Sequence, residues 1–184
     1  MTLLKKCLLG TMVASVSTLG FTAEVPMGPA QEVFGMEIAS VYLQPITMDI
    51  QMGLPAEESD VHLELDIHAT KDNQNTFAEG WWIPYLTVKY QVEKLDRRTK
   101  EVQSVQSGEL MPMVASDGPH YGVNAKLQGE GLYRIKYQVF PPNMNKKIDF
   151  GRHIDKETFA PEWFQPFQVE WEFPWAGPGE KGSY

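Results

Sequence analysis

The amino-acid sequence predicts an all-β protein, and more specifically an immunoglobulin-like antiparallel β-sandwich. Apolar and polar residues alternate over several short stretches, and turn-forming Gly, Pro, Asn and Asp residues lie between these stretches. No segment shows the period of an amphipathic helix with comparable clarity. Short strands joined in this way are typical of two packed antiparallel sheets, and a closed barrel is the main alternative.

The first 23 residues have the features of a secretory signal peptide. Lys5 and Lys6 precede the run CLLGTMVASVSTLGFTA, which ends in small residues. The run is interrupted by Ser and Thr and is shorter than the roughly 20 residues that a membrane-spanning helix needs. We therefore expect residues 1–23 to be cleaved and residues 24–184 to form one β-sandwich domain, with a flexible C-terminal segment at 176–184.

Loss of the signal peptide changes what chemistry is available. It removes Cys7, the only cysteine of the chain, which excludes a disulfide scaffold, a Cys-rich zinc site and a cysteine nucleophile. It also removes two of the 16 basic residues, so 14 basic residues face 24 acidic ones and the formal charge changes from −8 to −10. This charge disfavours nucleic acid and anionic lipid as partners and attracts cations.

Each expected strand follows from the two-residue period of a half-buried strand. The clearest alternating stretches lie at 39–46, 61–68, 85–94, 131–140 and 167–173. Turn residues separate them at 95–100, 116–122, 128–131 and 141–145. Met111 and Met113 also alternate along a strand, and Pro112 between them predicts an edge or a strand end, because proline cannot donate to the sheet.

The stretch VHLELDIHAT places four polar residues on one side of a strand, namely His62, Glu64, Asp66 and His68. Neighbours on one face are about 7 Å apart, whereas His62 and His68 are about 20 Å apart. One metal ion cannot bind both histidines, but it can bind an adjacent pair such as His62 and Glu64. A solvated strand face is the alternative interpretation.

Two other segments offer donors. Met113, Asp117 and His120 lie close together in sequence around an Asp-Gly-Pro turn, and His153 lies in the polar stretch DFGRHIDKET. Imidazole, carboxylate and thioether without thiolate form a mixed donor set, which suits copper and iron better than calcium or structural zinc. Because histidine must be neutral to bind, metal affinity should weaken as the pH falls through about 6.5.

Other chemistries are less well supported. The sequence contains no G-x-S-x-G nucleophile elbow, no P-loop and no G-x-G-x-x-G motif. Trp81 and Trp82 could form a platform on which a sugar stacks, although such aromatic residues more often close the end of a sandwich core.

Five segments together resemble the periplasmic iron-transport protein family, whose members bind copper and iron and are associated with a bacterial inner-membrane iron permease. These segments are GMEIASVYLQPI, VHLELDIHA, EGWWIPYLTVKY, LMPMVASDGPHYG, and GRH followed by WFQPF. The resemblance runs in order over nearly the whole mature chain. It implies an immunoglobulin-like sandwich that forms a homodimer, with metal sites near the subunit interface.

The resemblance also implies a ligand set. Residues at positions that match the family pattern are His62, Glu64, Met113, Asp117, His120 and His153. Asp117 would serve a second, adjacent cation, and His153 would reach the site across the dimer. Asp66 and His68 match the pattern too, but the distance along the strand keeps His68 out of a site built on His62. We expect His68 to have a structural role or to support the ligands without binding the ion.

The expected function is therefore that of a periplasmic protein that binds copper and iron ions and assists high-affinity iron uptake through an inner-membrane permease, without inserting into the membrane itself. A copper-dependent ferroxidase or reductase that acts on iron before transport is the alternative. A third possibility is a β-sandwich chaperone or sugar binder that uses Trp81 and Trp82.

Overall fold

A computed structural model describes residues 24–144 and 148–178, and the alternating stretches form strands in it. The strands are β1 (Val25–Pro26), β2 (Gln31–Val33), β3 (Met36–Leu43), β4 (Val61–Ala69), β5 (Thr87–Leu95), β6 (Val102–Ala115), β7 (Gly118–Ala125), β8 (Gly131–Phe140) and β9 (Phe167–Trp175). The described residues contain one short 3-10 turn, Ala56–Glu58, and no α-helix. In this part of the chain no helix has the length and apolar character needed to span a bilayer. The predicted signal peptide, residues 1–23, and residues 179–184 of the predicted flexible C-terminal segment lie outside the described residues.

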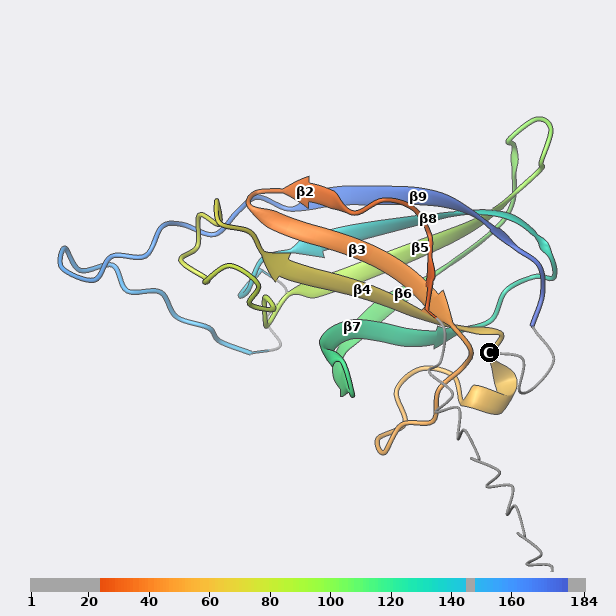
Figure 1. Ribbon diagram of the computed structural model, residues 1–184, viewed down its shortest axis with the longest axis horizontal. Helices are drawn as coiled ribbons and strands as arrows, with labels where there is room; N and C mark the ends of the chain where they lie inside the picture. Colours follow the sequence, from red (N-terminus) through yellow and green to blue (C-terminus); the bar gives the residue numbers. More distant parts are fainter. Residues whose placement is uncertain (1–23, 145–147, 179–184) are drawn as a thin grey trace, which may run out of the picture.

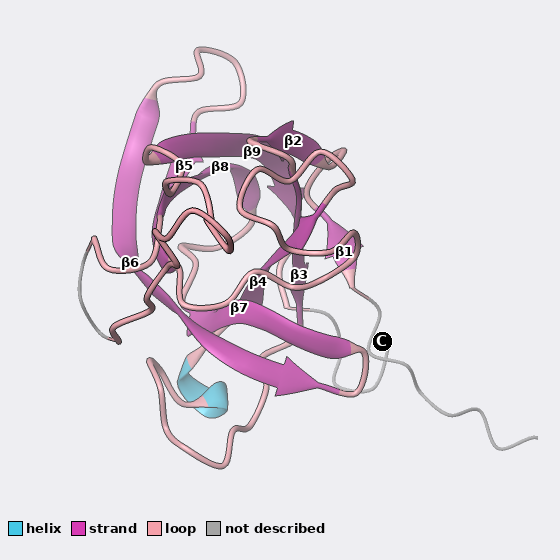
Figure 2. Ribbon diagram, turned by 90° about the vertical axis from the view of Figure 1, so that its left-hand side faces the viewer, coloured by secondary structure: helices cyan, strands magenta, loops and turns pink. Residues whose placement is uncertain are grey.

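The strands form one antiparallel path that folds back on itself into two layers (Figures 1 and 2). The order is β1-β3-β4-β7-β6-β5-β8-β9, and β2 pairs with β3. The long strand β6 joins the layers, because its first half pairs with β5 and its second half with β7. The fold is thus the predicted sandwich.

The two ends of this path meet through side chains. Gln31 Nε2 donates to the Glu170 carbonyl at 2.9 Å, and Trp171 Nε1 donates to the Pro29 carbonyl at 2.8 Å. Among the described residues no ladder joins β9 to β1, β2 or β3. The closed barrel is therefore not the observed arrangement.

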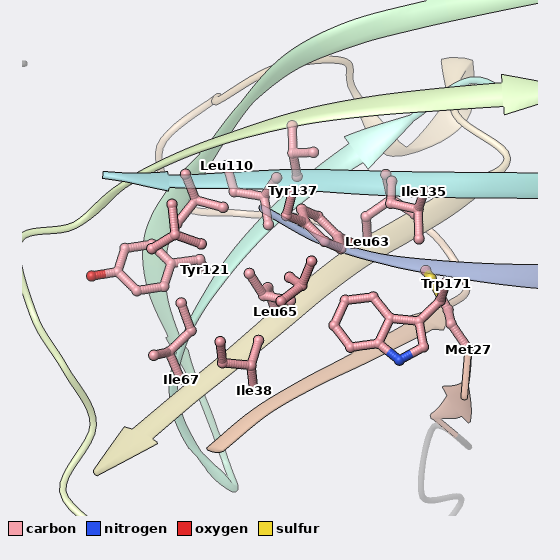
Figure 3. Packing of buried hydrophobic residues seen from close by; sticks show 14 of the residues in the cluster. Met27, Ile38, Leu63, Leu65, Ile67, Leu110, Tyr121, Ile135, Tyr137 and Trp171 are labelled. Carbon is pink, nitrogen blue, oxygen red and sulfur yellow. The ribbon is translucent and has the colours of Figure 1, made fainter. Parts of the chain in front are cut away.

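The core lies between the layers and is built from the inward residues of each strand (Figure 3). Leu63, Leu65 and Ile67 of β4 face Ile135 and Tyr137 of β8, and all five are completely buried. Because successive side chains of a strand point to opposite faces, burial of these leucines turns the polar residues of β4 to the outer face of the sheet.

Strand β7 was not expected from the sequence, which suggests a turn over 116–122. Only Ser116 and Asp117 lie between β6 and β7, and Pro119 already belongs to β7. At Pro119, β7 pairs with β6 alone, so the N–H that proline lacks is not needed to pair with a second strand. The edge position predicted for Pro112 is confirmed, since the second half of β6 pairs only with β7.

The segment 148–166, which precedes β9, makes a long excursion from one end of the sandwich (Figure 1). Aromatic contacts hold its base. Phe150 packs on Tyr85 and stacks on Trp163, with ring centroids 4.8 and 5.6 Å apart, and Phe164 stacks on Phe34. Residues 151–162 extend beyond these contacts, and we call them the arm.

Candidate metal centre

Three donor side chains converge on the outer face of the sheet. His62 and Glu64 come from β4, and His120 comes from β7. Glu64 Oε1 lies 3.6 Å from His62 Nε2 and 3.3 Å from His120 Nε2. One ligand atom from each residue falls within 4.8 Å of the others. This spacing allows a single ion to bind all three, because metal–ligand bonds of about 2 Å place donors a few ångströms apart.

The strand register explains why these residues meet. Glu64 pairs with Gly122, and Met113 of β6 pairs with His120. Gly122 has no side chain, and a Cβ atom there would lie 2.5 Å from His62 Nε2 and 3.1 Å from Met113 Sδ. The space that this glycine leaves open is therefore lined by an imidazole nitrogen and a thioether sulfur.

The two imidazole nitrogens are buried and unpaired. His62 and His120 are 0% and 3% exposed, and neither Nε2 atom forms a hydrogen bond. A buried polar atom without a partner costs about 1–3 kcal/mol, so such atoms call for a ligand. A metal ion bound between His62, Glu64 and His120 would take both lone pairs. The residues present thus fit a copper ion, which accepts imidazole, carboxylate and thioether donors.

Burial also sets the protonation of these groups. It lowers the pKa of His62 to about 4, against the opposing effect of a hydrogen bond to Asn124, and it lowers the pKa of His120. Burial, with the nearby charges of Glu24, Asp66 and Asp117, raises the pKa of Glu64 to about 8. The expectation that histidine protonation near pH 6.5 controls binding is therefore revised. Both imidazoles are neutral at pH 7, and the proton that a metal ion must displace is on the Glu64 carboxyl group.

An acidic depression of about 220 Å³ opens beside the centre. Its lining includes Glu24, Asp66, His68 and Asp117, and it reaches His120. Burial and a hydrogen bond to Asp117 raise the pKa of Glu24. The structure thus places Asp117 at the mouth of the centre, and His68 lies in the depression, outside the cluster of His62, Glu64 and His120.

His153 is the one predicted ligand that lies apart from the others. It belongs to the arm, its side chain is 73% exposed, and its Nδ1 atom lies 2.7 Å from Thr158 Oγ1. The tryptophan pair does not form a flat platform. Trp81 is 62% exposed, whereas the Trp82 ring packs against buried Tyr121 at 5.0 Å, as expected of an aromatic residue that closes a core.

Three residues of the site escaped the sequence analysis. Gly122 falls within the predicted turn 116–122 and Asn124 lies just after it, while Glu24 directly follows the predicted signal peptide, where no pattern marks it. The signal for β7 was the alternation of buried Tyr121 and Val123 with polar or small neighbours.

Comparison with known proteins gives the family. Residues 21–177 match the family of Fe2+ transport proteins. The chain belongs to this family. A UPF0423 protein of Brucella abortus is 55% identical over 162 residues, which cover 88% of this chain and 86% of the relative. The 34 kDa membrane antigen of Treponema pallidum is 34% identical over 84% of this chain and 76% of its own length.

Two solved structures are also similar to this Fe2+ transport family protein. FetP of uropathogenic Escherichia coli strain F11, expressed in the periplasm, is 47% identical, with a TM-score of 0.76 over 86% of this chain and 99% of that one. Copper-reconstituted P19 of Campylobacter jejuni is 43% identical, with a TM-score of 0.77 over the same shares. The resemblance to the iron-transport family, and with it the fold, is confirmed.

Proposed function

We propose that this protein is a periplasmic metal-binding protein that binds copper at His62, Glu64, Met113 and His120 and assists iron uptake. One observation carries the proposal: two buried, unpaired imidazole nitrogens and a carboxylate oxygen lie within 4.8 Å of one another, and the His62 nitrogen borders the space that Gly122 leaves open beside the Met113 thioether. A solvated strand face does not explain this arrangement, because the residues are buried and their donor atoms face one another.

The relatives support copper as the resident ion. The similar structures include a copper-bound FetP variant in which a glutamate is replaced, and copper-bound P19 variants in which a glutamate, a methionine or an aspartate is replaced. The replaced methionine and aspartate of P19 are four positions apart. Met113 and Asp117 have the same spacing.

The chain's own residues prepare the site. His62 and His120 are neutral and present Nε2, while the Glu64 carboxyl group gives up its proton when a cation arrives. Carboxyl groups in the acidic depression attract cations toward His120 and suit ferrous or ferric iron as the transported ion, because hard oxygen donors favour such ions.

The arm supports a homodimer in which His153 completes the metal centre of the partner. Ile154 and Phe159 are 78% and 57% exposed at its surface, and hydrogen bonds within the arm hold His153 beside Thr158. Large exposed apolar side chains favour burial against a second copy. The downstream partner in this proposal is an inner-membrane iron permease.

A copper-dependent ferroxidase or reductase is the second candidate. The acidic depression shares His120 with the metal centre, so an iron ion held there would lie next to copper, which supplies a one-electron couple when bound. Continued oxidation of Fe(II) with dioxygen as the electron acceptor, by copper-loaded but not metal-free protein, would support this candidate. A single stoichiometric reaction would contradict it.

Iron uptake tests the transport proposal. Cells that express the permease should accumulate radioactive iron with the native protein, and uptake should fall with the His62→Ala/His120→Ala variant although the variant reaches the same level in the periplasm. Equal uptake with the two proteins would contradict a role of the metal centre in transport.

A further inference from the structure

We propose that Asn124 is a positioning residue that holds the His62 imidazole with Nε2 directed into the metal centre and fastens the segment 46–54 beside it. This inference rests on the proposed function, because it assigns His62 as a ligand. Asn124 lies on β7, directly opposite His62 in the strand register, and is only 2% exposed.

The orientation of the Asn124 amide is fixed by the main chain around it. Its Nδ2 atom donates to the carbonyl oxygens of Ile46 and Leu54 at 2.8 and 3.1 Å. Its Oδ1 atom accepts the main-chain N–H of Ile46 at 3.2 Å. The reversed amide would place its oxygen against two carbonyls and its NH₂ group against an N–H. Only one orientation therefore satisfies these groups.

This orientation determines the tautomer of His62. Oδ1 of Asn124 lies 2.9 Å from His62 Nδ1, and an amide oxygen can only accept. His62 Nδ1 must therefore carry the hydrogen, which leaves a lone pair on Nε2, the atom that faces Glu64 and the space beside Gly122. A partner on the second ring nitrogen orients a metal-binding histidine and raises its basicity.

The same side chain holds the connection between β3 and β4. Ile46 and Leu54 are anchored by one amide, and Gly53 forms a parallel bridge to Asn124, beyond the residues at which β7 pairs with β6. The position of this segment and the orientation of His62 thus depend on one buried group. Loss of the amide should release both together.

Two variants separate the contacts. Asn124→Ala removes all four hydrogen bonds. Asn124→Asp keeps an oxygen that accepts from His62 Nδ1 but lacks the Nδ2 donor to the carbonyls of Ile46 and Leu54. Asn73→Ala is the matched control, since Asn73 also fastens a loop, through Nδ2 to the Gly35 carbonyl at 3.1 Å, away from the metal centre.

Three measurements follow. Nitrogen-15 NMR of metal-free native protein should show His62 as the Nδ1–H tautomer, and Asn124→Asp should keep it. Copper affinity, measured by competition with a chelator, should fall 10- to 100-fold in Asn124→Ala, the range found when such orienting partners are removed, and should not fall in Asn124→Asp or Asn73→Ala. Hydrogen exchange of residues 46–54 should quicken in both Asn124 variants.

Results that contradict the positioning role of Asn124 can be told apart from results that contradict the proposed function. An Nε2–H tautomer in the native protein, or unchanged copper affinity in a folded Asn124→Ala variant, would overturn the positioning role. If Asn124→Ala does not fold, the tautomer of the native protein and the behaviour of Asn124→Asp test the positioning role instead. Loss of the Nδ1–H tautomer or of copper affinity in Asn124→Asp would overturn that role. If native protein binds no copper, the proposed function fails, and with it the assignment of Asn124 as a metal-positioning residue, whatever the tautomer.

Discussion

Replacing Gly122 with alanine should block the metal centre without removing any ligand. The added Cβ would lie 2.5 Å from His62 Nε2 and 3.1 Å from both His62 Cε1 and Met113 Sδ. A copper ion bound to His62 would sit about 2 Å from the same nitrogen, in the same space. The methyl group and the ion therefore exclude each other.

The size of the effect follows from which atoms can move. The Met113 side chain is flexible and can yield, whereas the His62 ring is completely buried and held by Asn124. In Gly122→Ala, therefore, either the His62 ring moves away from its position or the methyl group occupies the space that the ion needs. Removing a group that only orients a ligand weakens metal binding 10- to 100-fold, so we expect Gly122→Ala to lose more than about 100-fold. The added methyl should also cost about 1–3 kcal/mol of stability through overpacking.

Gly108→Ala provides the matched control. A Cβ at Gly108 of β6 would lie 2.7 Å from Tyr90 Cε1, so the added methyl meets a similar obstruction at a place that contains none of the proposed ligands. Thermal unfolding should show a comparable loss of stability in both variants, and chelator competition should show lost copper affinity only in Gly122→Ala. Native copper affinity in a folded Gly122→Ala variant would refute the placement of the ion beside Gly122.

The remaining predictions concern protons and the arm. Because the pKa of Glu64 is about 8, copper binding at pH 7 should release about 0.9 proton from this group. Calorimetry in buffers of different ionisation enthalpy measures this, and equal heats would contradict it. In the metal-free protein the raised pKa of Glu64 gives stability that is complete below pH 4.5 and lost as the pH rises through 8, by at most about 5 kcal/mol, and Glu64→Gln should remove this loss in pH-dependent unfolding. The lowered pKa of His62 has the opposite effect on the free energy of unfolding, so stability should also be lost as the pH falls from 6.5 through 4. In His62→Gln, stability should depend less on pH over this range. His153→Ala should leave the unfolding temperature unchanged but weaken copper binding, and this loss should be absent at concentrations where sedimentation shows only monomers.

Most of the fold could be predicted from the sequence where one face of a strand is buried. The alternation in VHLELDIHA identified β4 and placed Leu63 and Leu65 inside, because a two-residue period has one solution on a half-buried sheet. Strand β7 was missed, because Gly118, Pro119 and Gly122 are ordinary turn residues and only the pairing with β4 and β6 makes them a strand.

The ligands could be named from residue types and the family resemblance, but their surroundings could not. Sequence spacing put His62 and Glu64 on one face, whereas their convergence with His120 depends on the register of β4 against β7. Burial, which moves the competing proton from histidine to Glu64, is a property of the packed fold and leaves no mark in a local pattern. Asn124 likewise acquires its role only through contacts with segments distant in sequence.

The most direct test of the metal centre is a calorimetric titration of the metal-stripped mature protein with Cu(II), beside the His62→Ala/His120→Ala variant. We expect saturable binding of one copper ion per chain in the native protein and none at these residues in the folded variant. Equal binding by the two proteins, or no binding by the native protein, would contradict the assignment of a copper centre to His62, Glu64, Met113 and His120.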